Sequence, residues 1–183
     1  MEARSKAFSW VIYLICCGKF LYESKVIVAN MDEPLDPGVL VECMIAKEMG
    51  KPIIQYRTDS RNPYGNTGEF HKGMHFFPLF PCDHFIFLPT LQFGSKTQVQ
   101  NFYNACADEL DTAIRGIDDK IQGQADQNMT KQAKDIVKLS KQLLEGATDL
   151  QSENSMRRIF KNYIAMAPKL RKFEPVMTYR MKY

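Results

Sequence analysis

The stretch that most constrains the fold runs over residues 26–61 and reads VIVANMDEPLDPGVLVECMIAKEMGKPIIQYRTDSR. Residues 25–30 form a β-branched run that ends in a polar loop, a pattern typical of a buried parallel strand. A helical segment follows, and residues 53–56 form a second apolar run. The order strand, helix, strand predicts a right-handed crossover and therefore a parallel sheet.

Three residues mark the ends of the expected helix. Asp36 is a favourable N-cap, and Pro37 occupies the first helical position, where its missing N–H costs nothing. Gly50 is a typical residue to end the helix before Lys51 and Pro52 lead into the next strand. A third strand is expected over residues 84–88, where Pro89 stops it.

The rest of the chain has a helical pattern. Ser95 and Gln98 form a capping box. The apolar residues after it share helical spacing and are Val99, Phe102, Tyr103, Cys106, Leu110, Ile114 and Ile117. Two more amphipathic helices are expected over residues 129–144 and 159–166, the second ending before Pro168. We therefore expect an α/β fold, with a flavodoxin- or Rossmann-like parallel sheet, flanking helices and a C-terminal helical extension.

Composition is ordinary for a globular protein of about one domain, with 183 residues, 45% hydrophobic and 25% charged. The net charge of +3 is too small to indicate nucleic-acid binding. Residues 156–183 contain eight Lys or Arg against Glu174 alone; a solvated basic tail is expected, and contact with an acidic surface is the alternative. The five cysteines form no CxxC pair, which favours a reducing, cytoplasmic location. No zinc ligand spacing is present, so no metal is expected.

The N-terminal region holds an apolar run, residues 8–17, preceded by Arg4 and Lys6. It is too short for a bilayer span, which takes roughly 20 residues. The Gly18-Lys19-Phe20 that follows is not a signal-peptidase site. We expect a buried element and no membrane contact, with a membrane or secretory role as the alternative.

Possible chemistry is concentrated at one edge of the expected sheet. Ligands bind at the carboxyl ends of parallel strands, where the acid-rich loops 30–36 and 57–61 lie. Glu42 is the only charge within the apolar run 39–46 and falls in the first two turns of the helix. It lies about 9 Å from Asp36 along the axis, which leaves room for a small ligand. The alternatives are that Glu42 points outward or pairs with Arg57 or Arg61, and that Asp36 only caps the helix.

The ordered motif of this region resembles that of the nucleoside 2-deoxyribosyltransferases. Its elements in chain order are Asp36-Pro37-Gly38, Glu42, Ala46, Gly50-Lys51-Pro52 and Arg57-Thr58-Asp59-Ser60-Arg61. The resemblance covers residues 22–117 and implies that Glu42 is a nucleophile that attacks the anomeric carbon of a 2'-deoxynucleoside. The deoxyribosyl ester then passes to a purine or pyrimidine base, or to water, with retention. Asp36 would contact the departing base and help to protonate it.

The resemblance also implies the wider site. The candidate substrate-binding residues are Asn30, Asp32, Gly38, Arg57, Asp59, Arg61, Met74 and His75. Met74 and His75 are candidates for a neighbouring subunit's loop, since the family forms homo-oligomers whose subunits complete each other's sites. Asp36 stands where a related branch has a phosphate-binding serine, so a nucleoside is expected rather than a nucleotide. No cofactor is implied.

The chain also departs from the family pattern. The family begins with a strand, a Gly-and-aromatic loop, a helix and another strand, whereas this chain reaches the Val26 strand after 25 residues. An aspartate that holds the sugar in the family falls here around Cys16 or Cys17. We therefore expect a deoxyribosyltransferase-like domain over residues 1–118 and a helical extension with a basic tail over 119–183. A catalytically impaired homologue with a binding or structural role is the alternative.

Overall fold

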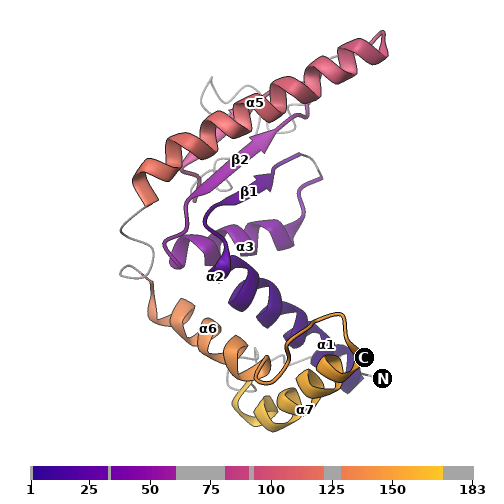
Figure 1. Ribbon diagram of the computed structural model, residues 1–183, viewed down its shortest axis with the longest axis vertical. Coiled ribbons are helices and arrows are strands. Elements are labelled where there is room, and N and C mark those ends of the chain that lie inside the picture. Colours follow the sequence, from indigo (N-terminus) through magenta and orange to yellow (C-terminus); the bar gives the residue numbers. More distant parts are fainter. Residues whose placement is uncertain (1, 33, 61–80, 91–92, 122–128, 171–183) are drawn as a thin grey trace, which may run out of the picture.

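The structure is a computed structural model that describes residues 2–32, 34–60, 81–90, 93–121 and 129–170. Its centre is a parallel sheet of three strands in the order β1 (Ile27–Asn30), β2 (Ile53–Arg57) and β3 (His84–Phe87) (Figure 1). The register places Ile27 opposite Ile53 and Ile54 opposite His84. The predicted α/β class with a Rossmann-like parallel sheet is confirmed.

Helix α3 (Pro37–Glu48) connects β1 to β2 as the sequence predicts. The Asp36 carboxylate accepts a hydrogen bond from Gly38 N at 2.7 Å, and Pro37 lies in the first turn. Gly50 has a φ of 71°, a left-handed conformation that suits glycine, directly before the chain enters β2. These local signals therefore fix both ends of the crossover helix.

The two faces of the sheet are covered by different helices. On one face the strands pack with α3, in a core that includes Ala29, Met31, Cys43 and Ile53. On the other face, α5 (Lys96–Ile121) contributes Ala113 and Ile117 to a core with Ile54 and Ile86. Adjacent residues of β2 thus enter different cores, as the alternation of side chains along a strand requires.

Helix α5 buries only part of the expected stripe. Tyr103 is 63% exposed and Ile114 is 38% exposed, whereas Ala113 and Ile117 are buried against the sheet, so only one side of the helix is covered. At the start of α5, Ser95 Oγ accepts a hydrogen bond from Gln98 N at 3.3 Å. The Gln98 side chain accepts from Gly94 N at 2.6 Å rather than from Ser95 N, so the predicted capping box forms with its return bond shifted by one residue.

The N-terminal region is helical throughout: α1 (Glu2–Ile15), a π-helical turn η1 (Cys16–Phe20) and α2 (Leu21–Glu23). Val11, Leu14 and Cys17 are buried, whereas Phe8 and Ile12 are about half exposed. The expected buried element is therefore buried along one side only. No helix in the described ranges combines the length and the apolar character that crossing a membrane requires.

The helices α6 (Lys131–Leu143) and α7 (Glu153–Leu170) pack with α1 rather than with the sheet's α5 face. The shared core of these helices consists of Val11, Leu14, Leu143, Ile159, Met166 and Leu170. In Figure 1 this group lies at the opposite end of a curved molecule from α5. The helical group is thus built from both halves of the sequence, and the domain division at residue 118 stays a prediction.

The expected end of the last helix is wrong. Helix α7 continues to Leu170, with Pro168 inside its last turn. A proline deprives the helix of one N–H and crowds the preceding turn, which is why an earlier end was expected. Leu170 is only 1% exposed and lies four residues after the buried Met166, so burial of its side chain favours the extra turn.

Candidate functional site

The start of α3 holds Asp36 and Gly38 in a fixed relation. One carboxylate oxygen of Asp36 is engaged by Gly38 N, and a β-carbon added at Gly38 would lie 3.1 Å from that oxygen. Any side chain at this position would therefore press on the cap. Both residues are exposed, so the helix start is open to a ligand at the carboxyl edge of the sheet.

Glu42 lies on the covered side of α3. It is half-buried, and the residues one and two turns further along the same side, Ala46 and Met49, are fully buried. The solvent side is taken instead by Val41 and Met44, which are 50% and 54% exposed. Glu42 forms no ion pair with any residue in the described part of the chain, so the expected alternatives of an outward position or a pairing with Arg57 are not observed.

Two thiols lie within the electrostatic reach of Glu42. Burial, and after it the negative charge of Glu42, raises the pKa of Cys17 to about 12, and the same two causes raise the pKa of Cys16. Both thiols are therefore protonated and neutral near pH 7. The position around Cys16 and Cys17, where the resemblance expects a sugar-binding carboxylate, does lie beside Glu42, but it carries no charge.

Asp32 joins the ends of β1 and β2. Its carboxylate accepts hydrogen bonds from Thr58 N at 2.6 Å, Thr58 Oγ1 at 2.7 Å and Asp59 N at 2.8 Å. Asn30 Oδ1 accepts a hydrogen bond from Asp32 N at 2.8 Å. Burial alone would raise the pKa of Asp32, but the hydrogen bonds from Thr58, Asp59 and Asn30 outweigh it and lower the pKa.

This arrangement brings Asn30, Asp32 and Asp59 together at one edge of the sheet. The residue that sequence reasoning missed is Thr58, whose N–H and hydroxyl both bind Asp32. The available signal was its position directly after a predicted strand, beside an acid-rich loop of the neighbouring strand. Because both oxygens of Asp32 already accept protein donors, this carboxylate primarily fixes the shape of the edge.

The other predicted site residues differ in their placement. Arg57 ends β2 and is fully buried, so its guanidinium does not lie on the surface of the edge. Asp59 is half-buried, with its N–H directed to Asp32. Arg61, Met74 and His75 lie outside the described residues.

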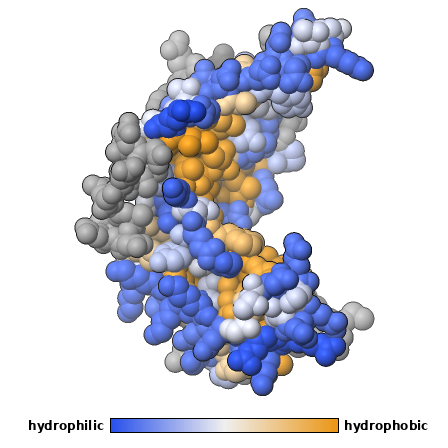
Figure 2. All heavy atoms as spheres, in the orientation of Figure 1, coloured by the Kyte–Doolittle hydropathy of each residue, from blue (hydrophilic) through white to orange (hydrophobic). Residues whose placement is uncertain are grey.

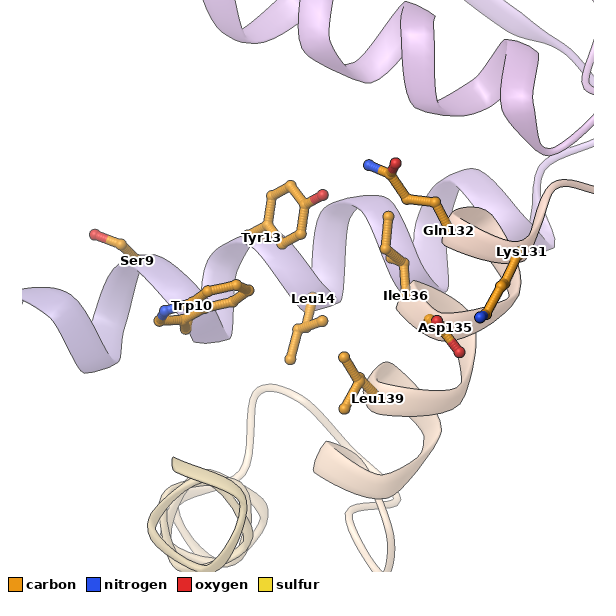
Figure 3. A pocket seen from close by; sticks show the side chains of 9 residues that line it. All are labelled: Ser9, Trp10, Tyr13, Leu14, Lys131, Gln132, Asp135, Ile136 and Leu139. Carbon is orange, nitrogen blue, oxygen red and sulfur yellow. The ribbon is translucent and has the colours of Figure 1, made fainter. Parts of the chain in front are cut away.

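A cavity of about 760 Å³ lies between α1 and α6 (Figure 3), and two smaller cavities lie elsewhere among the described residues. Trp10 and Tyr13, with their rings 5.8 Å apart, project into it from α1, and Ile136 and Leu139 from α6. Glu42 and Asp36 line none of these three cavities. In the described part of the chain, no three His, Cys, Asp or Glu side chains lie close enough together to hold a metal ion.

The observed geometry groups the predicted residues into two sets. Asp36, Gly38 and Glu42 lie in the first two turns of α3, with Glu42 in electrostatic reach of Cys16 and Cys17. The Asn30, Asp32 and Asp59 group joins the adjoining strand ends. No family model, no curated protein and no solved structure matches this chain.

Proposed function

We propose that the protein transfers a 2-deoxyribosyl group from a 2'-deoxynucleoside to a second base or to water, through a covalent ester on Glu42. The observation that carries the proposal is the position of Glu42 on the covered side of a helix that begins at the carboxyl edge of a parallel sheet. Glu42 is also free of ion pairs with described residues and follows the capping Asp36 by six positions. A half-buried carboxylate that forms no ion pair within the described ranges is available as a nucleophile.

The reaction takes two displacements. A Glu42 carboxylate oxygen attacks the anomeric carbon, and the base leaves with the electron pair of the N-glycosidic bond and takes up a proton that Asp36 relays to it from water. An incoming base, or water, then attacks the same carbon from the side just vacated, gives up a proton that Asp36 relays back to water, and releases Glu42. Two inversions give overall retention, as in retaining glycosidases.

The site residues divide into supporting roles under this proposal. Gly38 lets the substrate approach the helix start, and the Asp32 clamp holds Asn30 and Asp59 toward the sugar. Asp36 favours a nucleoside over a nucleotide, because its carboxylate would repel a phosphate at the helix start. A homo-oligomer would complete the site with residues from a neighbouring subunit, Met74 and His75 being the candidates.

The test is conversion of deoxyinosine in the presence of adenine, followed by separation of free and exchanged bases. The wild-type protein should release hypoxanthine, and Glu42→Gln should lower kcat/KM by at least about a thousandfold, as expected for loss of a covalent nucleophile. Glu48→Gln is the matched control. It removes the same charge from the same helix, at the end where Glu48 accepts a hydrogen bond from Thr130 Oγ1 at 3.1 Å.

Equal values of kcat/KM for the wild type and Glu42→Gln would rule out Glu42 as the nucleophile. A second readout is a covalent deoxyribosyl adduct on the peptide that contains Glu42, trapped with a slow 2'-fluorinated nucleoside and detected by mass spectrometry. An adduct on another residue would identify that residue, and not Glu42, as the nucleophile.

A second candidate function is nucleoside binding without catalysis. It is favoured by the neutral thiols at Cys16 and Cys17 and by the absence of Glu42 from the three described cavities. In that case the wild type would be inert, and deoxyinosine would bind with equal affinity to the wild type and Glu42→Gln in calorimetry.

A further inference from the structure

One flank of α6 carries a hollow of about 480 Å³ that is distinct from the cavity in Figure 3. Three lysines of α6, Lys134, Lys138 and Lys141, line it, and all three are exposed. The other lining residues are Tyr22, Met129, Val137 and Gln142. No carboxylate belongs to this set, so every charge that lines the hollow is positive. Figure 2 shows hydrophilic side chains gathered over this part of the molecule.

A fourth cation reaches the same place from a distant part of the sequence. Lys51, from the turn between α3 and β2, has its Nζ 5.5 Å from the centre of the Tyr22 ring. The Nζ of Lys141 lies 5.1 Å from the same centre. Tyr22 therefore holds two ammonium groups near its ring through cation–π attraction. Of the two lysines, Lys51 is only 9% exposed. The fold thus concentrates positive charge at this point.

The charge of the three α6 lysines is not neutralised within the described part of the protein. Elsewhere, cations pair with carboxylates, as in Lys47–Asp83 at 2.7 Å and Arg157–Glu153 at 2.6 Å. Among the described residues, Lys134, Lys138 and Lys141 form no ion pair. Like charges held close together repel one another, and a bound anion relieves that repulsion.

The backbone that carries these lysines is held tightly. A β-carbon added at Gly18 of η1 would lie 2.3 Å from Ser140 Cβ and 3.0 Å from Ile136 O, so α6 crosses η1 at minimal separation. At the start of α6, Thr130 Oγ1 accepts a hydrogen bond from Ala133 N at 3.2 Å. The position of α6 beside Tyr22 is therefore fixed in advance, and only the lysine side chains need to move for binding.

We propose that this hollow is a binding site for a multiply charged phosphate ligand. On a helix, Lys134, Lys138 and Lys141 are spaced over about 10 Å, which matches two or three linked or neighbouring phosphate groups. A phosphate ester supplies up to two charges in one compact group, whereas a carboxylate supplies one. Lysine binds phosphate as a mobile point charge with three donors. None of the lining residues belongs to the Glu42 site, so the inference does not depend on the proposed catalysis.

The test compares two sources of the same chemistry. In one arm, inorganic tripolyphosphate is titrated into the full-length protein by calorimetry. In the other, the protein is sedimented with vesicles of phosphatidylcholine alone or with phosphatidylcholine that contains phosphatidylinositol phosphate. The site variant is K134Q/K138Q/K141Q. The control variant, K131Q/K161Q/K169Q, removes the same charge from exposed lysines that do not line the hollow.

We expect the wild type to bind in at least one arm and the site variant to bind about tenfold more weakly or worse. The control variant should stay within about twofold of the wild type, and binding should weaken as salt screens the charges. Binding of tripolyphosphate alone indicates a free phosphate ligand, and binding of the phosphoinositide vesicles alone indicates a lipid headgroup. Failure of both arms, or equal losses in the two variants, would overturn the proposal.

Discussion

Asp32 lies at the carboxyl edge of the sheet and Glu42 lies in the helix that begins there, and their surroundings give the two carboxylates different properties. Three protein donors surround the Asp32 carboxylate, whereas Glu42 forms no ion pair with a described residue and lies beside neutral thiols. The Asp32 carboxylate, whose oxygens accept these hydrogen bonds, holds two loops together. The Glu42 carboxylate has no such ion-pair partner among the described residues, so its oxygens stay available. At the scale of single residues, the number of hydrogen-bond donors around each carboxylate distinguishes Asp32, which has a structural role, from Glu42, which is the candidate nucleophile.

Replacing Asp32 with Asn should lower the free energy of unfolding at pH 7 by about 1–2 kcal/mol, because hydrogen bonds to a charged acceptor are lost at a partly exposed site. The folded pKa of Asp32 is lowered, so its contribution is present above the unfolded pKa of about 3.9 and is lost as the pH falls through the folded pKa. Urea unfolding at neutral and acidic pH measures the free energy of unfolding of the wild type and Asp32→Asn. The difference between the two free energies should become smaller in acid. Asp36→Asn is the control, since Asn caps helices as well as Asp. An unchanged stability at pH 7 would contradict the clamp.

At the scale of elements, the crossover unit could be predicted because its signals are local. Asp36, Pro37 and Gly50 each restrict the backbone within a few residues of their own position. The hydrogen bonds between the strand ends were harder to predict. The sequence predicts acid-rich loops on one edge of the sheet, but the role of Thr58 as the main donor depends on the register of β1 against β2.

The partners of the N-terminal helix could not be predicted. Its pattern marks Val11 and Leu14 as apolar, but no local signal states that they pack against Leu143 and Leu170. The π-helical turn and the continuation of α7 past Pro168 are likewise consequences of tertiary packing. Sequence reasoning fails where a contact joins segments far apart in the chain, since periodicity reports a buried side but not what buries it.

The crossing of η1 and α6 gives a prediction at this scale. Gly18→Ala should destabilise the protein by about 1–3 kcal/mol, because the new methyl group would overlap Ser140 and the Ile136 carbonyl. Gly116→Ala on α5 is the matched control. No atom lies within 4 Å of an added β-carbon there, so the better helix propensity of Ala should stabilise by up to about 1 kcal/mol. Thermal unfolding of both variants checks this, and a stabilised Gly18→Ala would show that the helices separate easily.

The whole molecule is curved, and its concave side lies between α5 and the helical group (Figure 1). Figure 2 shows hydrophobic side chains along the concave side, between α5 and the helical group. Among the described strands, β1 pairs only with β2, so no described strand pairs with its other edge, and Val28 on β1 is 42% exposed. These features favour the proposed homo-oligomer, in which a second copy covers the β1 side.

Light scattering coupled to size-exclusion chromatography tests this association. The wild type should elute as a dimer or larger, and Val28→Lys should shift it toward the monomer, because a charge would be buried in the interface. Ile164→Lys is the control, since Ile164 lies on α7 and is 72% exposed. A wild type that stays monomeric at high concentration would contradict the homo-oligomer.

The packing of α1 against α6 and α7 joins segments that are far apart in the chain. The β1–α3–β2 unit closes over short loops and can form early, whereas α1 must wait for partners more than a hundred residues further along the chain. Until they arrive, Val11 and Leu14 stay uncovered. We therefore expect the contacts of α1 with the last two helices to form after those within the β1–α3–β2 unit.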